Sequence, residues 1–190
     1  MKLFFYDLET TGVNPGRNGI HQMSGMIVID GEVKEKFNFQ VRPNPKAVIE
    51  KEALEAAGVT EQQVLSYPPM EQVYKQKLIP MLDKYIDRFN KTDKFFLVGY
   101  NNAHFDNDFF RGFFLQNGDK YFGSYFWANC FDYMVLATAH LADKRHLMPN
   151  FKQGTVAKEL GINVDDERLH DALYDIEICK NIYDIVCGKY

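Results

Sequence analysis

Residues 3–12 read LFFYDLETTG, and this stretch decides the fold. The four consecutive apolar residues, 3–6, predict a central strand that is buried on both faces. Asp7 and Glu9 follow at its end, two residues apart, so their side chains point to the same face. Two like charges in one small region are unfavourable unless a cation joins them. This strand end is therefore the first candidate site.

The next segments predict two more strands, antiparallel to the first. Residues 10–19 are rich in glycine, asparagine and proline and form a turn-rich connection. A second strand is expected over residues 21–30, with a hairpin turn at Asp30-Gly31. A third is expected over residues 36–42, where apolar and polar residues alternate.

Helical periodicity dominates the rest of the chain. A short helix is expected within residues 45–57, ended by Gly58, and Thr60 can cap the segment that follows. Residues 70–90 repeat apolar side chains with a helical period, and Pro80 is expected to kink that helix. A buried strand is expected over residues 94–100, and further helices over 104–116, 132–141, 155–160 and 171–186.

The predicted fold class is therefore α/β, with a mixed sheet of three antiparallel strands plus parallel strands, flanked by helices. The 190 residues suit a single domain, 1–190, and 46% hydrophobic and 25% charged residues are ordinary for one. The formal net charge of −4 argues against a protein that coats long nucleic acid. It does not exclude an enzyme that grips a strand end.

Cysteine usage and hydropathy predict the location. The three cysteines lack metal-ligand spacing, so no disulfide framework is expected and a reducing, cytoplasmic location is predicted. No apolar run reaches membrane-spanning length, and the first residues are too short for a signal peptide. No membrane partner is therefore expected.

Two further carboxylates lie on apolar helix faces. Asp175 falls inside the apolar stripe of the last predicted helix, and Asp106 lies beside three phenylalanines of its own helix. An unpaired buried carboxylate is costly, so both call for compensation. With Asp7 and Glu9 they could converge on a divalent metal, and oxygen-only ligands favour Mg²⁺ or Mn²⁺. The alternative, that each is an ordinary cap or surface acid, stays open on these grounds.

The same residues belong to three short patterns. In chain order these are Asp7-Leu8-Glu9-Thr10-Thr11-Gly12, Asn102-Ala103-His104-Phe105-Asp106 and His170-Asp171-Ala172-Leu173-Tyr174-Asp175. Together they resemble the motifs of DEDDh-type 3′→5′ exonucleases, over about residues 2–187. That family includes the proofreading epsilon subunit of bacterial replicative polymerase, ribonuclease T and oligoribonuclease. The resemblance implies a ribonuclease-H-like fold and hydrolysis of phosphodiester bonds at the 3′ end of nucleic acid, releasing nucleoside monophosphates.

The resemblance also implies cofactors and catalytic residues. Two divalent metal ions, Mg²⁺ or Mn²⁺, would be held by four carboxylates: Asp7, Glu9, Asp106 and Asp175. Asp7 would bridge both ions, and Glu9 and Asp175 would bind the one that carries the attacking water. Asp106 would serve the other ion. His170 would be the general base that deprotonates the water, although its position alone would suggest a surface histidine.

Substrate contacts are implied around the first two motifs. The backbone at Thr10 would hold the terminal 3′ hydroxyl, and Val13 would wedge against the last bases. Phe105 would stack on the terminal nucleotide, unless it only packs in the core. The remaining predicted contacts are Leu8, Thr11, Gly12 and Asn102. Asn101 and Ala57 stand where relatives often carry histidine, so substrate preference transfers less well than chemistry.

The alternatives to this function concern the polymer that is cut and whether the protein is an enzyme or a binding module. DNA is the favoured polymer; an RNA-trimming exoribonuclease is the runner-up, but oligoribonucleases usually carry Met where this chain has Thr10. An inactive relative that binds nucleic acid or a partner is disfavoured, because all five catalytic positions are filled. The expected partner is single-stranded or 3′-end nucleic acid. A polymerase or homodimer partner stays open, although the chain shows no tethering segment before Tyr190.

Overall fold

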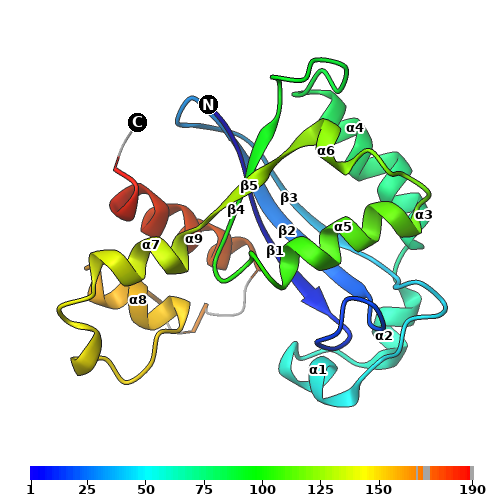
Figure 1. Cartoon of the computed structure of the whole chain (residues 1–190). Coiled ribbons are helices and arrows are strands. Elements are labelled where there is room, and N and C mark those ends of the chain that lie inside the picture. Colours follow the sequence, from blue (N-terminus) through cyan, green and yellow to red (C-terminus); the bar gives the residue numbers. More distant parts are fainter. Residues whose placement is uncertain (166, 169–171, 189–190) are drawn as a thin grey trace.

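The computed structural model describes residues 1–165, 167–168 and 172–188. A five-stranded sheet forms its centre (Figure 1). Its strands are β1 (Lys2–Thr10), β2 (Ile20–Ile29), β3 (Glu32–Gln40), β4 (Phe95–Gly99) and β5 (Phe126–Asp132), in the spatial order β3-β2-β1-β4-β5. The β1–β2 and β2–β3 pairs are antiparallel, and the β1–β4 and β4–β5 pairs are parallel. The predicted α/β fold with a mixed sheet is confirmed.

Strand β1 lies at the centre because its first half offers apolar side chains to both faces. Phe4 and Tyr6 are buried in the cluster on one face, and Leu3 and Phe5 in the cluster on the other. A strand covered on both sides needs this continuous apolar run, which ends where the acidic residues begin.

Helices cover both faces of the sheet (Figure 1). On one face lie α3 (Met70–Val73), η1 (Tyr74–Leu78), α4 (Ile79–Asp83), α5 (Asp106–Gln116) and α6 (Phe122–Tyr125). On the other lie α7 (Tyr133–His140), α8 (Gln153–Glu159) and α9 (Ala172–Val186). The short elements α1 (Lys51–Ala56), α2 (Glu61–Ser66) and η2 (Arg145–Leu147) complete the described helices.

Aromatic rings fix α5 against the sheet. The ring of Phe4 on β1 stacks on Phe110 of α5, with centroids 5.9 Å apart. It also meets the ring of Phe126 on β5 edge-on at 5.5 Å. Such pairs contribute about 0.5–1.5 kcal/mol each beyond their burial. They hold the first residue of α5, Asp106, near the end of β1.

The predicted turns and caps are confirmed. Asp30 and Gly31 have φ values of 51° and 85°, as a two-residue hairpin turn requires. Gly58 ends α1 with a φ of 65°. The Thr60 hydroxyl accepts a hydrogen bond from the backbone N–H of Gln63, and the Gln63 side chain accepts one from Thr60 in return.

The helix predicted over residues 70–90 is confirmed over residues 70–83, with an irregular turn before Pro80, and its predicted end at residue 90 is wrong. The segment passes from α3 through a π-helical turn, η1, into α4, which ends at Asp83. Pro80 has no N–H, and its ring would clash with the carbonyl four residues earlier. A wider turn just before the proline relieves that clash.

Strand β5 was not predicted. Most of its residues are half-buried or exposed, and it pairs on one side only, so it shows neither an apolar run nor alternation. The helix expected from residue 132 begins at Tyr133, with Asp132 as its cap. Within residues 1–165, 167–168 and 172–188, no helix is long and apolar enough to cross a membrane.

Candidate functional site

Three elements carry the four acidic side chains singled out in the sequence. Asp7 and Glu9 lie on β1, opposite Ser24 and Gln22 of β2, and share the sheet face of Phe5. Helix α9 packs on that face, where the Tyr183 ring meets the Phe5 ring edge-on at 5.3 Å. Asp175 lies in the first turn of α9, and Asp106 is the first residue of α5.

These carboxyl groups hold their protons unusually tightly. Burial, and then the charge of Asp175, raises the pKa of Asp7 from 3.8 to about 6. Burial, then Asp7 and Asp175, raises the pKa of Glu9 from 4.5 to about 7. Burial, then Asp7, raises the pKa of Asp106 from 3.8 to about 8, against hydrogen bonds from the backbone N–H groups of Asp106 and Leu8. Because Asp175 acts on Asp7 and Glu9, and these two act on Asp106, the structure brings all four into one region.

The causes of the pKa shifts at Asp7, Glu9 and Asp106 are burial, backbone N–H groups and other carboxylates of the described residues. Neither Lys, Arg nor His contributes to the pKa shift of Asp7, Glu9 or Asp106. In the same part of the chain, no three His, Cys, Asp or Glu side chains already enclose a volume suited to a metal ion. The carboxylates share a region without forming a closed cage, as like charges do when nothing bridges them.

A cavity of about 370 Å³ opens beside Asp7 and Asp175. The start of α8 also lines it, with Lys152 and Gln153, and Lys158 lies further along the same helix. The lining therefore contains both acidic and basic side chains, and a lysine is a suitable contact for a phosphate.

The loop after β1 is held by Thr11, which is fully buried. Its hydroxyl donates to the carbonyl of Val48 at 2.8 Å and accepts from the backbone N–H of Gly19 at 3.0 Å. A Cβ at Gly12 would lie 2.3 Å from the Asn18 amide nitrogen, so glycine is needed there. Both residues shape the loop, and their predicted substrate contacts stay predictions.

Other predicted substrate contacts lie in contrasting surroundings. Val13 is 77% exposed at the loop tip, and the Thr10 hydroxyl donates to the Gly12 carbonyl at 2.8 Å. Leu8 is buried in the core. The Phe105 ring packs on Phe109, with centroids 5.1 Å apart, which supports the core-packing alternative.

Asn102 differs from the other predicted contacts because its amide is buried without a partner. The side chain is 1% exposed, and neither Nδ2 nor Oδ1 has a hydrogen-bond partner among the described residues. Gly99 makes room for it, since a Cβ there would lie 2.8 Å from Asn102. A buried unpaired amide is costly, and at a functional site it is a candidate for binding a ligand.

His170, the predicted general base, lies outside the described residues, as does Asp171. Its placement relative to the carboxylates therefore stays a prediction.

Some residues of the site were not found by sequence analysis. Asp132 accepts hydrogen bonds from the backbone N–H groups of Asn101 at 3.0 Å and Ala103 at 3.4 Å, so it supports the loop before Asp106. Lys152 and Gln153 belong to the cavity wall. The capping position of Asp132 was a detectable signal, whereas nothing local marked the other two.

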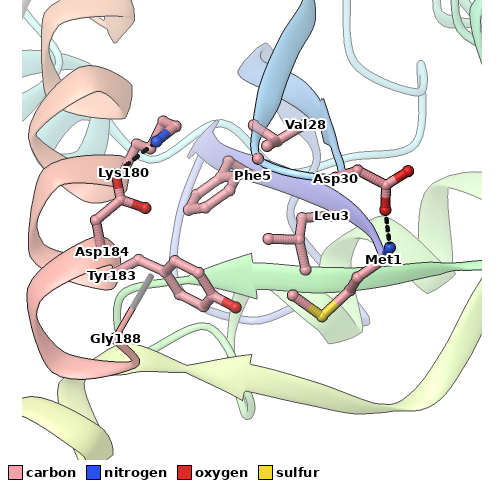
Figure 2. A pocket seen from close by; sticks show the side chains of 10 residues that line it. Met1, Leu3, Phe5, Val28, Asp30, Lys180, Tyr183, Asp184 and Gly188 are labelled. Atoms are coloured by element: carbon pink, nitrogen blue, oxygen red, sulfur yellow. Dashed lines mark hydrogen bonds and ion pairs between the residues drawn. The ribbon is translucent and has the colours of Figure 1, made fainter. Parts of the chain in front are cut away.

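A larger cavity, of about 680 Å³, lies at the other end of β1 (Figure 2). Leu3, Phe5 and Val28 form its apolar floor. The charges at its rim pair with each other, the amino group of Met1 with Asp30 and Lys180 with Asp184. It offers no unpaired acid or base for hydrolysis among the described residues, so the acidic end of β1 is the candidate active site.

The sequence of the chain matches one known protein family. The RNase T family model, described as exonuclease, matches residues 4–183. The chain belongs to this family of DEDD-type 3′→5′ exonucleases.

Individual relatives are longer than this chain. It is 24% identical, over 180 residues, to the PolC-type DNA polymerase III of Mycoplasmopsis pulmonis (strain UAB CTIP); the match covers 94% of this chain and 11% of that protein. Structures of Escherichia coli exonuclease I with dT13 and dA16 oligonucleotides match with TM-scores of 0.74 and 0.76, at 19% and 18% identity. Each match covers 99% of this chain and 41% of exonuclease I. A zinc-bound form of its complex with single-stranded DNA has a TM-score of 0.72 at 19% identity, over 97% of this chain and 40% of that one. These likenesses show the fold.

Proposed function

We propose that this exonuclease domain hydrolyses the terminal phosphodiester bond of a nucleic acid strand from its 3′ end and releases nucleoside monophosphates. Asp7, Glu9, Asp106 and Asp175 hold two divalent metal ions, Mg²⁺ or Mn²⁺. The observation that carries the proposal is the meeting of these carboxyl groups at one end of β1, where Asp175 raises the pKa of Asp7 and Glu9, and Asp7 raises the pKa of Glu9 and Asp106.

The donor set fits divalent metal. All four side chains offer oxygen, the ligand that Mg²⁺ and Mn²⁺ prefer. Burial and neighbouring carboxylates raise the pKa values of the proposed ligands Asp7, Glu9 and Asp106. Metal binding would lower those pKa values and remove the repulsion. When bound, two such ions stabilise the charge that develops on the attacking and leaving oxygens.

Side chains and backbone groups of the protein transfer the proton and bind the strand. His170 takes the proton of the attacking water, since a neutral imidazole with a pKa near 6.5 is a suitable base at neutral pH. Lys152 lines the same cavity as Asp7 and Asp175 and binds a phosphate of the strand. The Thr10 backbone and the exposed Val13 hold the last nucleotide.

Single-stranded DNA is the proposed polymer, with RNA as the alternative. Support comes from the relatives: the exonuclease I structures contain dT13 and dA16 oligonucleotides, and the Mycoplasmopsis relative is a DNA polymerase. That relative also supports a polymerase partner, with a homodimer as the alternative. A cytoplasmic location stays a prediction.

The test is a time course with 5′-labelled single-stranded DNA and RNA of matched sequence. Each would be incubated with Mg²⁺, with Mn²⁺ and with chelator, beside an Asp7→Asn variant. We expect a ladder that shortens from the 3′ end, is faster on DNA, and disappears with chelator and in the variant. A faster RNA ladder would reassign the substrate. If the protein binds the oligonucleotides but shortens neither of them with Mg²⁺ or Mn²⁺, it is a binding module and not an exonuclease.

A further inference from the structure

The starts of three helices meet behind the acidic side chains. Tyr133 is the first residue of α7, Gln153 is the first of α8, and Asp175 lies in the first turn of α9. The Gln153 side chain joins them: its Nε2 donates to the backbone carbonyl of Asp175 at 3.1 Å. Its Oε1 accepts from the Tyr133 hydroxyl at 3.1 Å and lies 3.5 Å from the Cys179 sulfur.

This network is largely buried and fixes the orientation of the Gln153 amide. Tyr133 is fully buried and Cys179 is 4% exposed, and the Tyr133 hydroxyl lies 2.6 Å from the Cys179 sulfur. The hydroxyl and the thiol each have a single hydrogen to donate. The Gln153 amide presents its NH₂ to the Asp175 carbonyl and its oxygen to the other two groups. A reversed amide would place its oxygen against the Asp175 carbonyl oxygen, which costs a hydrogen bond.

The network stays protonated beside the negative charges. Burial, and more weakly Asp7, raises the pKa of the Cys179 thiol well above its usual range. Burial, then Cys179, raises the pKa of the Tyr133 hydroxyl well above its usual range. Both groups therefore keep their hydrogens at neutral pH. Asp7 influences both, so the network lies directly behind the Asp7–Asp175 side of the cavity.

We propose that Gln153 is a positioning residue, which sets Asp175 opposite Asp7 by binding the Asp175 backbone carbonyl. This inference rests on the proposed role of Asp175 as a metal ligand. Asp175 stands on a helix that packs on the sheet from one side, whereas Asp7 belongs to the sheet itself. A bond between the α8 side chain and the Asp175 backbone fixes the spacing between the two ligands. Metal ligands that are oriented in this way bind metal more tightly.

Mn²⁺ binding to the whole chain, measured by electron paramagnetic resonance without substrate, tests the proposal. Gln153→Met keeps the length of the side chain and removes both hydrogen bonds. We expect its apparent Kd for Mn²⁺ to rise about tenfold. Tyr133→Phe leaves the bond to Asp175 in place and should weaken binding less. Gln72→Met, at an exposed position of α3, is the matched control and should bind like wild type.

A double variant separates positioning from general support of the fold. In an Asp175→Asn background, Gln153→Met should weaken Mn²⁺ binding no further, because the ligand that it positions is absent. Equal weakening in both backgrounds, or a Kd for Gln153→Met within twofold of wild type, would overturn the proposal. Failure of the wild-type protein to bind Mn²⁺ would instead overturn the metal site itself, and this inference with it. If Gln153→Met does not fold, Gln153→Leu, which also removes both hydrogen bonds, is measured in its place by the same criterion.

Discussion

The backbone N–H of Leu8 interacts with the side chain of Asp106 and opposes the rise of its pKa. Leu8 lies between Asp7 and Glu9, so this interaction links the first acidic pair to α5, the helix on the opposite face of the sheet. Asp175 belongs to α9, which packs on the face of the sheet that does not contact α5. The site is thus assembled at the end of one strand from both layers of the fold.

Stability should fall with rising pH in the metal-free protein. The pKa values of Glu9 and Asp106 are raised to about 7 and about 8, so the folded state holds protons that the unfolded state has released. Their stabilising effect is lost as pH rises through those values. Urea unfolding in chelator should show a decrease in the free energy of unfolding between pH 6.5 and 8.5.

This window also avoids an opposite effect. Burial lowers the pKa of His21 to about 4, so that histidine favours folding at higher pH, but only up to its usual value of 6.5. Mn²⁺ should abolish the decrease above pH 6.5. A free energy of unfolding that increases across the window in chelator would contradict the raised carboxyl pKa values.

Replacement of Asp106 should separate stability from activity. Asp106→Asn removes a buried charge, so at pH 8 in chelator the variant should be more stable than wild type. Activity should fall at least about a hundredfold, because a metal ligand is lost. Asp108→Asn, two residues later on the exposed side of α5, is the matched control and should change neither. Loss of stability in Asp106→Asn would argue for a structural role.

His170→Ala should reduce turnover and leave binding intact. A general base contributes about 10²–10⁴-fold, and its removal should lower kcat while the Kd values for Mn²⁺ and for an oligonucleotide stay near wild type. Stopped-flow or single-turnover kinetics would measure the step. Turnover close to wild type would remove His170 from the mechanism.

Val13 and Phe105 should respond differently to truncation. Val13 is exposed, so Val13→Ala should raise KM for the oligonucleotide by a few-fold without a change in Tm. Phe105 packs on Phe109, and Phe105→Ala should lower Tm as well. Unchanged KM in both variants would place substrate elsewhere.

Lys152 should contribute to substrate binding by charge. Lys152→Ala should raise KM with little change in kcat, and should reduce the salt dependence of log(kcat/KM) by a slope of about 0.7, as expected for one single-strand phosphate contact. Lys120→Ala, an exposed lysine outside the cavity, serves as the control. An unchanged salt slope in Lys152→Ala would show that the cavity does not take a phosphate.

Local patterns explain which features could be predicted. The apolar run of β1, the Asp30-Gly31 turn and the Thr60 cap each depend on residues a few positions apart, and all three are found. Strand β5 was missed because an edge strand carries little apolar periodicity. The irregularity that was expected at Pro80 is found as a π-helical turn, but the early end of the helix at Asp83 was missed because the apolar period continues beyond it.

The sequence by itself determined the acidic residues, their order and the strand that carries the first two, because apolar periodicity and short motifs depend only on neighbouring residues. Only the tertiary structure decided what surrounds them. The interaction of Leu8 with Asp106, and the network from Tyr133 through Gln153 to Asp175, join residues that are at least 20 positions apart. Such contacts depend on how the helices pack across the sheet, and no local pattern along the chain records that packing.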